Sequence, residues 1–433
     1  MIDVLRRHAR PLLWLVAINA VLRGAWLWWV HPPQLYDFSW YYTHAVGILH
    51  GEGYSWYGHP TAYWPMGYPF FLAGLFALFR PSVLLGLAVN AMLSTATVLV
   101  VYSLSLLATA RRRVAFAAAL GYTLLPSQIE WNAVLGSEAL YTCLLMAGLV
   151  LYAWLRQREK SPALLVCAGL CVGVSCVVRP IALLFPLAVL CVERWSYRQS
   201  WRRSLVHGCA FALGLAIGVM PATLRNLLVM HHFIVVSTNG GVDLWQGTHV
   251  DGVYFWSWDP KVNPLLPYSQ NDVLQNQVAT HVAVQYILHH PLRTFLHGLA
   301  KWFFLYWQDN NVVGVTFGQL TPAWSPRALW WTGVGNTAVY YLWMAVAMVG
   351  LCYGLRHRIP LSPAWWLAFA YVIYNTAIFF FFPAWDRFRY PIMPCLAVSF
   401  GVGWMVVSER WLQRRRLPRL LLWRRQDEEE ERV

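Results

Sequence analysis

The side chain best suited to chemistry in this sequence is Asp37, the only acidic residue among the first 50 apart from Asp3. It follows the first long apolar stretch. A carboxylate at the mouth of a membrane bundle is costly unless water, a partner or a substrate uses it. We therefore treat Asp37 as the leading candidate for chemistry. The structural alternative is that Asp37 caps a short helix over 38–49, a contribution of about 1 kcal/mol.

Few other carboxylates could serve the same chemistry. The chain has 19 acidic residues, and five of them form the segment 427–431, which indicates a solvated tail rather than a site. Glu138 is the strongest of the rest as a substrate-binding residue, although at a helix start it could simply compensate the helix dipole. Ten acids are expected at the outer side of the membrane: Asp37, Glu52, Glu130, Glu138, Asp243, Asp251, Asp259, Asp272, Asp309 and Asp386.

Cationic side chains are expected at the same side, next to the ends of apolar stretches. Guanidinium groups bind phosphate oxygens in a bidentate manner, which makes arginines there candidates for a phosphate site. The structural alternatives are pairing with a nearby acid and snorkelling to the membrane interface. The candidates are Arg179, Arg225, Arg387 and Arg389.

Aromatic residues are dense after Asp37. They could stack on sugar rings, but interfacial anchoring is an equally good interpretation. Asn239 opens an Asn-Gly-Gly sequence that predicts a tight turn first and a sugar contact second. The aromatic set is Tyr54, Trp56, Tyr57, Tyr63, Trp64 and Tyr68, with Tyr41 and Tyr42 preceding it.

The sequence offers no convincing metal site. The histidines at 44, 50, 59, 231 and 232 lack the spacing of a metal-binding set, and the eight cysteines contain no Cys-x-x-Cys pair. We expect no metal and no certain cofactor, since a divalent metal has no support in the pattern. The cysteines are interpreted as small packing residues.

The elements that position these residues must be membrane helices. The 433-residue chain is 58% hydrophobic and only 12% charged, whereas soluble domains carry about 25% charged residues. The net charge of +14 is concentrated in short basic segments between apolar runs, which is the positive-inside pattern and argues against nucleic-acid binding. These segments lie at 6–10, 111–113, 156–160, 194–203, 356–358 and 410–425.

Nine stretches are long and apolar enough to cross a bilayer, which needs roughly 17–25 residues each. A tenth, 180–192, is shorter but is bounded by Arg179-Pro180 and by Glu193-Arg194, and we count it as well. We predict an all-α polytopic fold of about ten to twelve transmembrane helices, forming one domain over 1–408 and followed by a charged tail over 409–433. The expected spans are 12–30, 82–109, 114–130, 139–155, 162–178, 180–192, 204–224, 334–355, 363–382 and 390–408.

Placing all basic segments in the cytoplasm, together with both termini, assigns two long segments to the outer side. These are 31–81 and 225–333, and the second is expected to form a modest cap. The apolar stretches 68–79 and 292–307 then become interfacial helices. The alternative is that 292–307 spans the membrane with a partner within 312–332.

The order of motifs along the chain resembles the bacterial glycosyltransferase family 39 proteins, relatives of protein O-mannosyltransferases and of the aminoarabinose transferase of lipid A. After Asp37 come Tyr41-Tyr42, a Gly-x-Gly-Tyr and Pro60-Thr-Ala-x-x-Pro-x-Gly-Tyr-Pro69. Later matches are Ser137-Glu138, Arg179-Pro180, Arg225-Asn226, Ser237-Thr-Asn-Gly-Gly241 and Arg387-Phe-Arg-Tyr-Pro-x-x-Pro394.

Two positions depart from that pattern. Many relatives carry a second acid directly after the first, where this chain has Phe38, and Pro-Met66-Gly stands in place of the commoner Pro-Pro-Gly. The first departure leaves Asp37 to act alone or with a distant acid such as Glu138.

The resemblance implies a GT-C fold in a bacterial cytoplasmic membrane. It also implies transfer of a sugar from a polyprenyl-phosphate donor to a glycan, lipid or protein acceptor, with inversion and with Asp37 as the base. Tyr41, Tyr42, Tyr63, Tyr68 and Asn239 would join Glu138 and the arginines in substrate binding. Two other readings stay open from the sequence: a transporter or flippase of lipid-linked glycans, and a non-catalytic lipid-binding assembly subunit.

Overall fold

The computed structural model describes residues 8–249, 256–356 and 362–414, and this part of the chain is almost wholly helical. The predicted tail from residue 415 onward, together with Arg6, Arg7, Asp251 and Arg358, lies outside the described residues. Six helices are long and apolar enough to cross a membrane. They are α2 (Ala9–Trp29), α5 (Val83–Thr109), α8 (Glu138–Gln157), α11 (Trp201–Met230), α16 (Pro326–Arg356) and α18 (Met393–Arg414), the last preceded by the 3-10 helix η6 (Asp386–Ile392).

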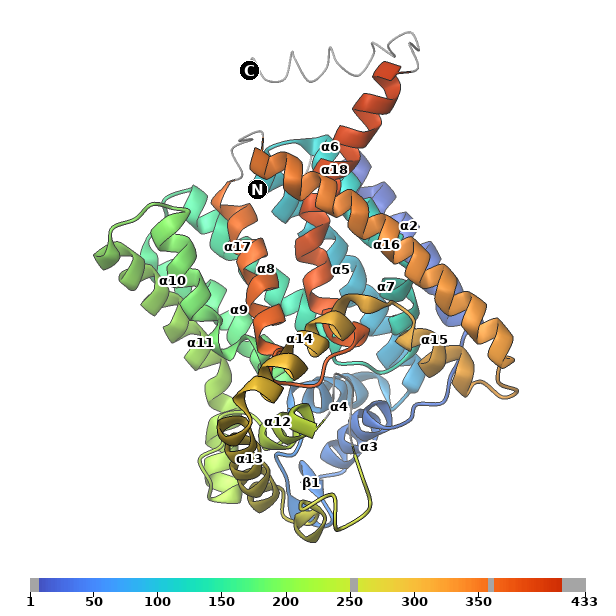
Figure 1. The fold of residues 1–433 in the computed structure, drawn as a ribbon, viewed down its shortest axis with the longest axis vertical. Coiled ribbons are helices and arrows are strands. Elements are labelled where there is room, and N and C mark those ends of the chain that lie inside the picture. The colour runs from blue at the N-terminus through green and yellow to red at the C-terminus, as the bar shows by residue number, and fades with distance from the viewer. Residues whose placement is uncertain (1–7, 250–255, 357–361, 415–433) are drawn as a thin grey trace.

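Shorter helices complete the bundle around these six (Figure 1). Each of the ten predicted spans contains a helix, so the expectation of an all-α membrane bundle is confirmed. The shorter helices are α6 (Arg112–Thr123), α7 (Pro126–Glu130), α9 (Leu165–Val178), α10 (Phe185–Trp195) and α17 (Pro363–Ile378). The 3-10 turns between them are η1 (Trp131–Ala133), η2 (Pro162–Leu164) and η3 (Pro180–Leu184).

Glycines allow the bundle helices to approach closely. In lipid, the hydrophobic effect does not drive helices together, so they associate through close packing at small residues. A Cβ added to Gly214 of α11 would lie 2.0 Å from the carbonyl oxygen of Val166 in α9. A Cβ added to Gly403 of α18 would lie 1.8 Å from the carbonyl oxygen of Val346 in α16. At both places, backbone meets backbone.

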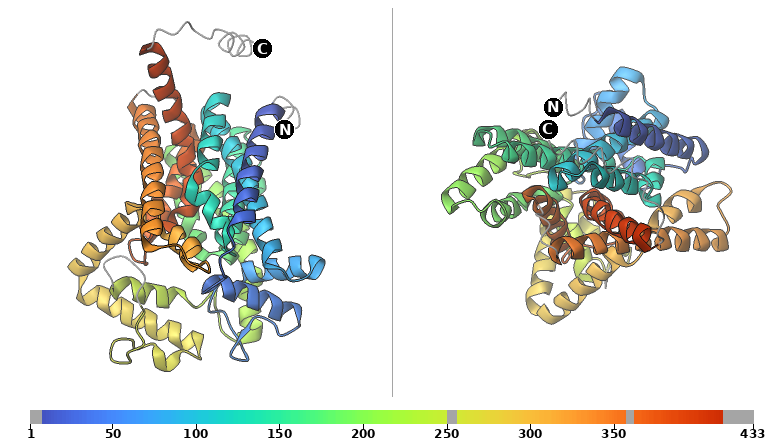
Figure 2. Two further views of the ribbon diagram at one scale, coloured as in Figure 1. Left: turned by 90° about the vertical axis from the view of Figure 1, so that its right-hand side faces the viewer. Right: turned by 90° about the horizontal axis from the view of Figure 1, so that it is seen from above.

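The two predicted outer segments gather at one end of the bundle, opposite the end at which α18 finishes (Figures 1 and 2). The first contains α3 (Asp37–Leu49), the short hairpin of β1 (Ser55–Trp56) and β2 (His59–Pro60), and α4 (Gly67–Phe79). The second contains α12 (Gly240–His249), η4 (Leu266–Tyr268), α13 (Asp272–His289), α14 (Pro291–Trp307), α15 (Asn311–Thr316) and η5 (Phe317–Gln319). We call this end the cap end.

The two outer segments are joined by charged side chains. The Asp272 carboxylate accepts hydrogen bonds from the Thr61 hydroxyl and the Ala62 amide, both at 2.9 Å, and from Thr238. Within the second outer segment, Lys301 of α14 donates to the carbonyl of Gly247 in α12 at 2.7 Å. Hydrogen bonds to charged groups contribute about 1.5–3 kcal/mol each to stability. These contacts therefore hold the elements of the cap end together.

The helices predicted over 68–79 and 292–307 are present as α4 and α14. At 13 residues, α4 is about 20 Å long, too short to cross a hydrocarbon core of about 30 Å. The 17 residues of α14 include Arg293 and Lys301. Their placement at the membrane interface stays a prediction.

Side-specific cysteine labelling tests the shared side of the outer segments. We expect His59→Cys and Gln270→Cys, both on the cap end, to react with a membrane-impermeant maleimide from one side only. Lys160→Cys, near the opposite end, should react only from the other side. The unsubstituted protein, with its own eight cysteines, gives the background. Reaction of positions 59 and 270 from opposite sides would refute the topology.

Candidate functional site

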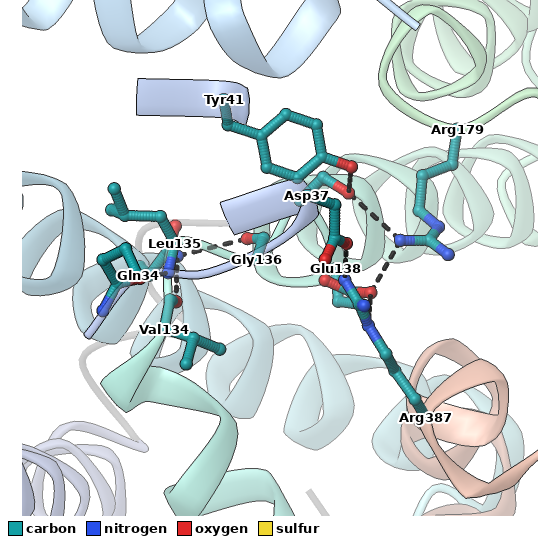
Figure 3. Close-up of polar contacts among 11 residues, drawn as sticks. Gln34, Asp37, Tyr41, Val134, Leu135, Gly136, Glu138, Arg179 and Arg387 are labelled. Carbon is teal, nitrogen blue, oxygen red and sulfur yellow. Dashed lines mark hydrogen bonds and ion pairs between the residues drawn. The ribbon is translucent and has the colours of Figure 1, made fainter. Parts of the chain in front are cut away.

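Arg387 brings together two carboxylates at the cap end. Its Nη2 lies 2.5 Å from Oδ2 of Asp37, and its Nε lies 2.6 Å from Oε1 of Glu138. Nη1 of Arg179 lies 2.6 Å from the same oxygen of Glu138. We call these four residues the ionic cluster (Figure 3). The structure thus unites four of the residues that the sequence singled out.

Each member of the ionic cluster sits at the end of a helical element. Asp37 and Glu138 are the first residues of α3 and α8, Arg179 follows the last residue of α9, and Arg387 lies in η6. At the ends of membrane helices, charged side chains can interact with backbone groups and water and need not lie in the hydrocarbon interior. This explains how a membrane bundle holds four ionisable groups together.

The helix-capping interpretation of Asp37 is wrong. The residue at the cap position of α3 is Tyr36, whose φ is 53° and whose side chain makes no capping hydrogen bond. Asp37 lies in the first turn, with Oδ2 turned to Arg387. Its Oδ1 makes no hydrogen bond to any residue that the structure describes. The side chain is 20% exposed, more than any other in the ionic cluster.

The position of Arg387 is set by its neighbours. The Asp386 carboxylate accepts from the backbone amides of Arg387 at 2.9 Å and Asn311 at 2.7 Å. The guanidinium carbon lies 4.8 Å from the ring centre of Phe38 and 5.3 Å from that of Trp131. Cation–π contact of this kind contributes about 0.5–2 kcal/mol. Phe38, the residue in place of the family's second acid, therefore stacks on the central arginine.

Side chains from distant segments fix the loop before Glu138. Gln34 accepts a hydrogen bond from the Leu135 amide at 2.7 Å, and Asn90 donates to the Gly136 carbonyl at 3.2 Å. Tyr68 donates to Asn90 at 3.0 Å. Tyr68 is fully buried, so its hydroxyl positions this loop. The sequence predicts a substrate contact for Tyr68, whereas the structure buries its ring 5.2 Å from that of Tyr41.

Glu138 is only partly satisfied by its partners. Both arginines bind Oε1, whereas Oε2 is buried and has no hydrogen-bond partner among the described residues. A buried acceptor without a partner costs about 1–3 kcal/mol. Oε2 lies close to Gly136, where an added Cβ would approach it to 2.6 Å. Glycine is therefore the residue that leaves room for this carboxylate.

The other predicted tyrosines lie at varying distances from the ionic cluster. The hydroxyl of Tyr41 lies 3.3 Å from that of Ser137, which also accepts from Arg179, and burial raises the pKa of Tyr41 to about 12. Tyr42 packs on Phe76 of α4, away from the cluster. Tyr63 lies in the hairpin region, with its ring 5.2 Å from that of Trp56.

Two of the predicted phosphate-binding arginines are occupied elsewhere. Arg225 donates to the backbone carbonyls of Tyr54 and Thr61, both at 2.7 Å. Arg389 is buried, donates to the Leu305 carbonyl at 2.6 Å and pairs with Asp309 at 2.6 Å. The structure does not bring either one into the ionic cluster.

Sequence reasoning omitted Asp243 from the site. Asn239, which was included, donates to Asp243 at 2.9 Å and accepts from Ser237 at 2.8 Å. Burial raises the pKa of Asp243 to about 7, and the charge of Arg179 opposes that shift. A carboxyl group on α12 therefore interacts electrostatically with the ionic cluster. The tight turn predicted at Asn-Gly-Gly is wrong, because α12 begins at Gly240. The place of Asp243 two residues after Gly241 was the available signal.

Within the described ranges, no group of three or more His, Cys, Asp or Glu side chains is arranged to hold a metal ion. The chemistry of the ionic cluster is that of two carboxylates and two guanidinium groups.

Comparison of the whole structure with solved structures shows the architecture. The chain is similar to the Archaeoglobus fulgidus oligosaccharyltransferase, solved in complex with zinc and sulfate, with a TM-score of 0.55 over 93% of this chain and 50% of that chain. The chain has the GT-C fold. Sequence identity is 15%, and the chain spans about half the length of that enzyme.

A weaker likeness is to ArnT from Cupriavidus metallidurans bound to undecaprenyl phosphate, with a TM-score of 0.41 and 13% identity over 90% of this chain and 75% of that one. No protein-family model and no curated protein matches the sequence. The GT-C fold expected from the motif order is confirmed by the architecture.

Gly136→Ala tests the packing around Glu138. We expect it to displace the Oε2 carboxylate and to lower the unfolding temperature of the purified protein, because overpacking costs about 1–3 kcal/mol. The matched control is Gly74→Ala in α4, where an added Cβ meets nothing within 4 Å. Equal unfolding temperatures for the two variants would show that the glycine is not needed to accommodate Glu138.

Proposed function

We propose that this protein transfers a sugar from a polyprenyl-phosphate donor to an acceptor at the cap end of the membrane bundle. The observation that supports this most is the ionic cluster, in which Asp37 and Glu138 share Arg387. A lipid donor lies in the bilayer while its phosphate and sugar meet water. The reacting groups therefore belong at the ends of membrane helices, where the cluster lies. The donor class is also consistent with the GT-C fold.

The arginines of the cluster suit the leaving phosphate. Arg387 uses Nε and Nη2 for the carboxylates, and Arg179 uses Nη1. Nη1 of Arg387 and Nη2 of Arg179 make no hydrogen bond to the described residues, so each guanidinium retains donors for a ligand. Charge that develops on the departing phosphate is stabilised by such preorganised donors. Two cations and two carboxylates leave the cluster near neutrality before an anionic donor binds.

Asp37 is placed to act as the general base. Its free oxygen, Oδ1, would take the proton from the acceptor hydroxyl as that oxygen bonds to the anomeric carbon. The bond from the anomeric carbon to the phosphate oxygen breaks, and the lipid phosphate leaves with the electron pair. A single displacement inverts the anomeric centre. A positioned base of this kind contributes about 10²–10⁴-fold.

Asp37→Asn tests this role. In membranes supplied with polyprenyl-phosphate sugars, we expect transfer to fall by about 10²-fold or more, because the amide cannot accept the proton. The matched control is Glu52→Gln, which neutralises an exposed carboxylate on the same outer segment and should retain activity. Near wild-type transfer by folded Asp37→Asn would exclude this residue as the base. Binding of the donor without transfer by the wild type would favour the assembly-subunit reading.

A second experiment distinguishes an arginine of the ionic cluster, Arg179, from the structural arginine Arg389. We expect Arg179→Gln to fold and to bind the donor about tenfold more weakly, as loss of a charge-assisted phosphate contact predicts. Arg389→Gln leaves Asp309 buried without its partner, which costs about 3–5 kcal/mol, so we expect loss of folded protein. Donor titration and size-exclusion chromatography measure the two effects. Unchanged donor affinity in Arg179→Gln would remove it from the phosphate site.

A further inference from the structure

A set of aromatic rings extends from the ionic cluster to the tip of the cap end. Its members come from α3, the β1–β2 hairpin, the loop after the hairpin and the segment before η4. We call this set the aromatic strip. It consists of Tyr41, Trp40, Trp56, Tyr57, Tyr63, Trp64, Trp256 and Trp258.

Ring contacts connect one arm of the strip without a break. Tyr57 stacks on Trp56 with centroids 4.8 Å apart, and Trp56 meets Trp40 edge to face at 5.0 Å. Trp40 contacts Trp64 at 4.9 Å, and Trp64 lies 6.3 Å from Tyr41. These spacings are those of favourable aromatic pairs. This arm ends beside the ionic cluster, because the Tyr41 hydroxyl lies next to Ser137.

A second arm branches at Tyr63. Its ring lies 5.2 Å from Trp56 and packs against the small core of α12 and α13, with which Trp256 also packs. Trp256 meets Trp258 at 6.0 Å. The strip therefore spans both outer segments.

The two outer ends of the strip, away from the ionic cluster, face solvent. Tyr57 is 64% exposed and Trp258 is 80% exposed. Figure 1 places β1 at the far tip of the cap end, beyond α3 and α4 as seen from the bundle. Aromatic anchors of a membrane protein lie at the headgroup level, close to the ends of the spans. Rings at the tip are thus in the wrong place to anchor the protein.

The hairpin that carries these rings is held in one shape. Its two-residue turn has positive φ at Tyr57 (51°) and Gly58 (77°), as tight hairpin turns require. Arg225 binds the backbone carbonyls on both sides of the hairpin, at Tyr54 and Thr61. Asp272 binds Thr61 from the other outer segment. A platform fixed in advance binds a ligand with a smaller loss of conformational entropy.

We propose that the aromatic strip is a binding site for a carbohydrate chain, which is the acceptor of the sugar. This rests on the proposed transfer function. Pyranose rings present apolar C–H faces to aromatic rings and hydroxyls at their edges. Polar groups flank the exposed rings, among them Ser55 and His59. The strip continues on α3 through Trp40 and the buried Tyr41, and Asp37 is the first residue of that helix. A glycan on the exposed rings would therefore have its terminal hydroxyl on the side of Asp37.

Binding can be measured separately from transfer. The full-length protein in lipid nanodiscs is applied to a glycan array that covers hexose, N-acetylhexosamine, uronic acid and deoxysugar oligomers. We expect wild type and Asp37→Asn to bind the same glycans. Tyr57→Ala and Trp56→Ala should bind them at least about tenfold more weakly, as buried aromatic anchors do on truncation. Trp56→Phe, which keeps an aromatic face, should recover most of the affinity.

The control variant is Trp195→Ala, which removes an exposed indole at the end of α10, away from the hairpin. It should bind glycans like the wild type. Binding by Asp37→Asn together with loss of transfer supports both proposals, whereas glycan binding with full transfer by that variant refutes only the base.

Three outcomes would overturn the carbohydrate site. The first is that the wild type binds no glycan on the array. The second is that Trp56→Ala and Tyr57→Ala bind as tightly as the wild type. The third is quenching by brominated lipids of fluorescence that Trp56→Phe lacks, because this would place the hairpin rings in the bilayer.

Discussion

The structure depends on one arginine that holds two carboxylates from helices far apart in the chain. Arg387 pairs with Asp37 at 2.5 Å and with Glu138 at 2.6 Å. Charges so poorly exposed are stable only when they are paired, because the desolvation of each one costs several kcal/mol. The starts of α3 and α8 and the segment η6 must therefore meet at one point, and the bundle is arranged to let them.

The residues of η6 make different contacts, and these contacts show how the ionic cluster is supported. Arg387 faces the ionic cluster, whereas Arg389 is buried against Asp309 and the end of α14. The carboxylate of Asp386, at the start of η6, accepts hydrogen bonds from two backbone amides. One short 3-10 segment thus links the site to the cap helices, and the two arginines have different functions despite their identical chemistry.

Much of this could be predicted from the sequence, because apolar stretches and basic segments report helices and sides of a membrane directly. The helices within the predicted spans, together with α4 and α14, followed from length and composition, although only six helices of the described residues are long and apolar enough to cross a membrane. The partners of Arg225 did not, since they are backbone carbonyls of a hairpin whose shape no local pattern encodes. The side on which Phe38 stacks was equally hidden, because a contact with residue 387 is a property of the assembled fold.

Tyr41 and Asp37 occupy a single turn of α3, so the ring that ends the aromatic strip and the carboxylate of the ionic cluster move as one rigid unit. A tilt of that helix changes the approach of a ligand and the pairing of Arg387 simultaneously. Variation that alters ligand preference while leaving the charges intact is therefore confined to the outlying hairpin and the segment around Trp258.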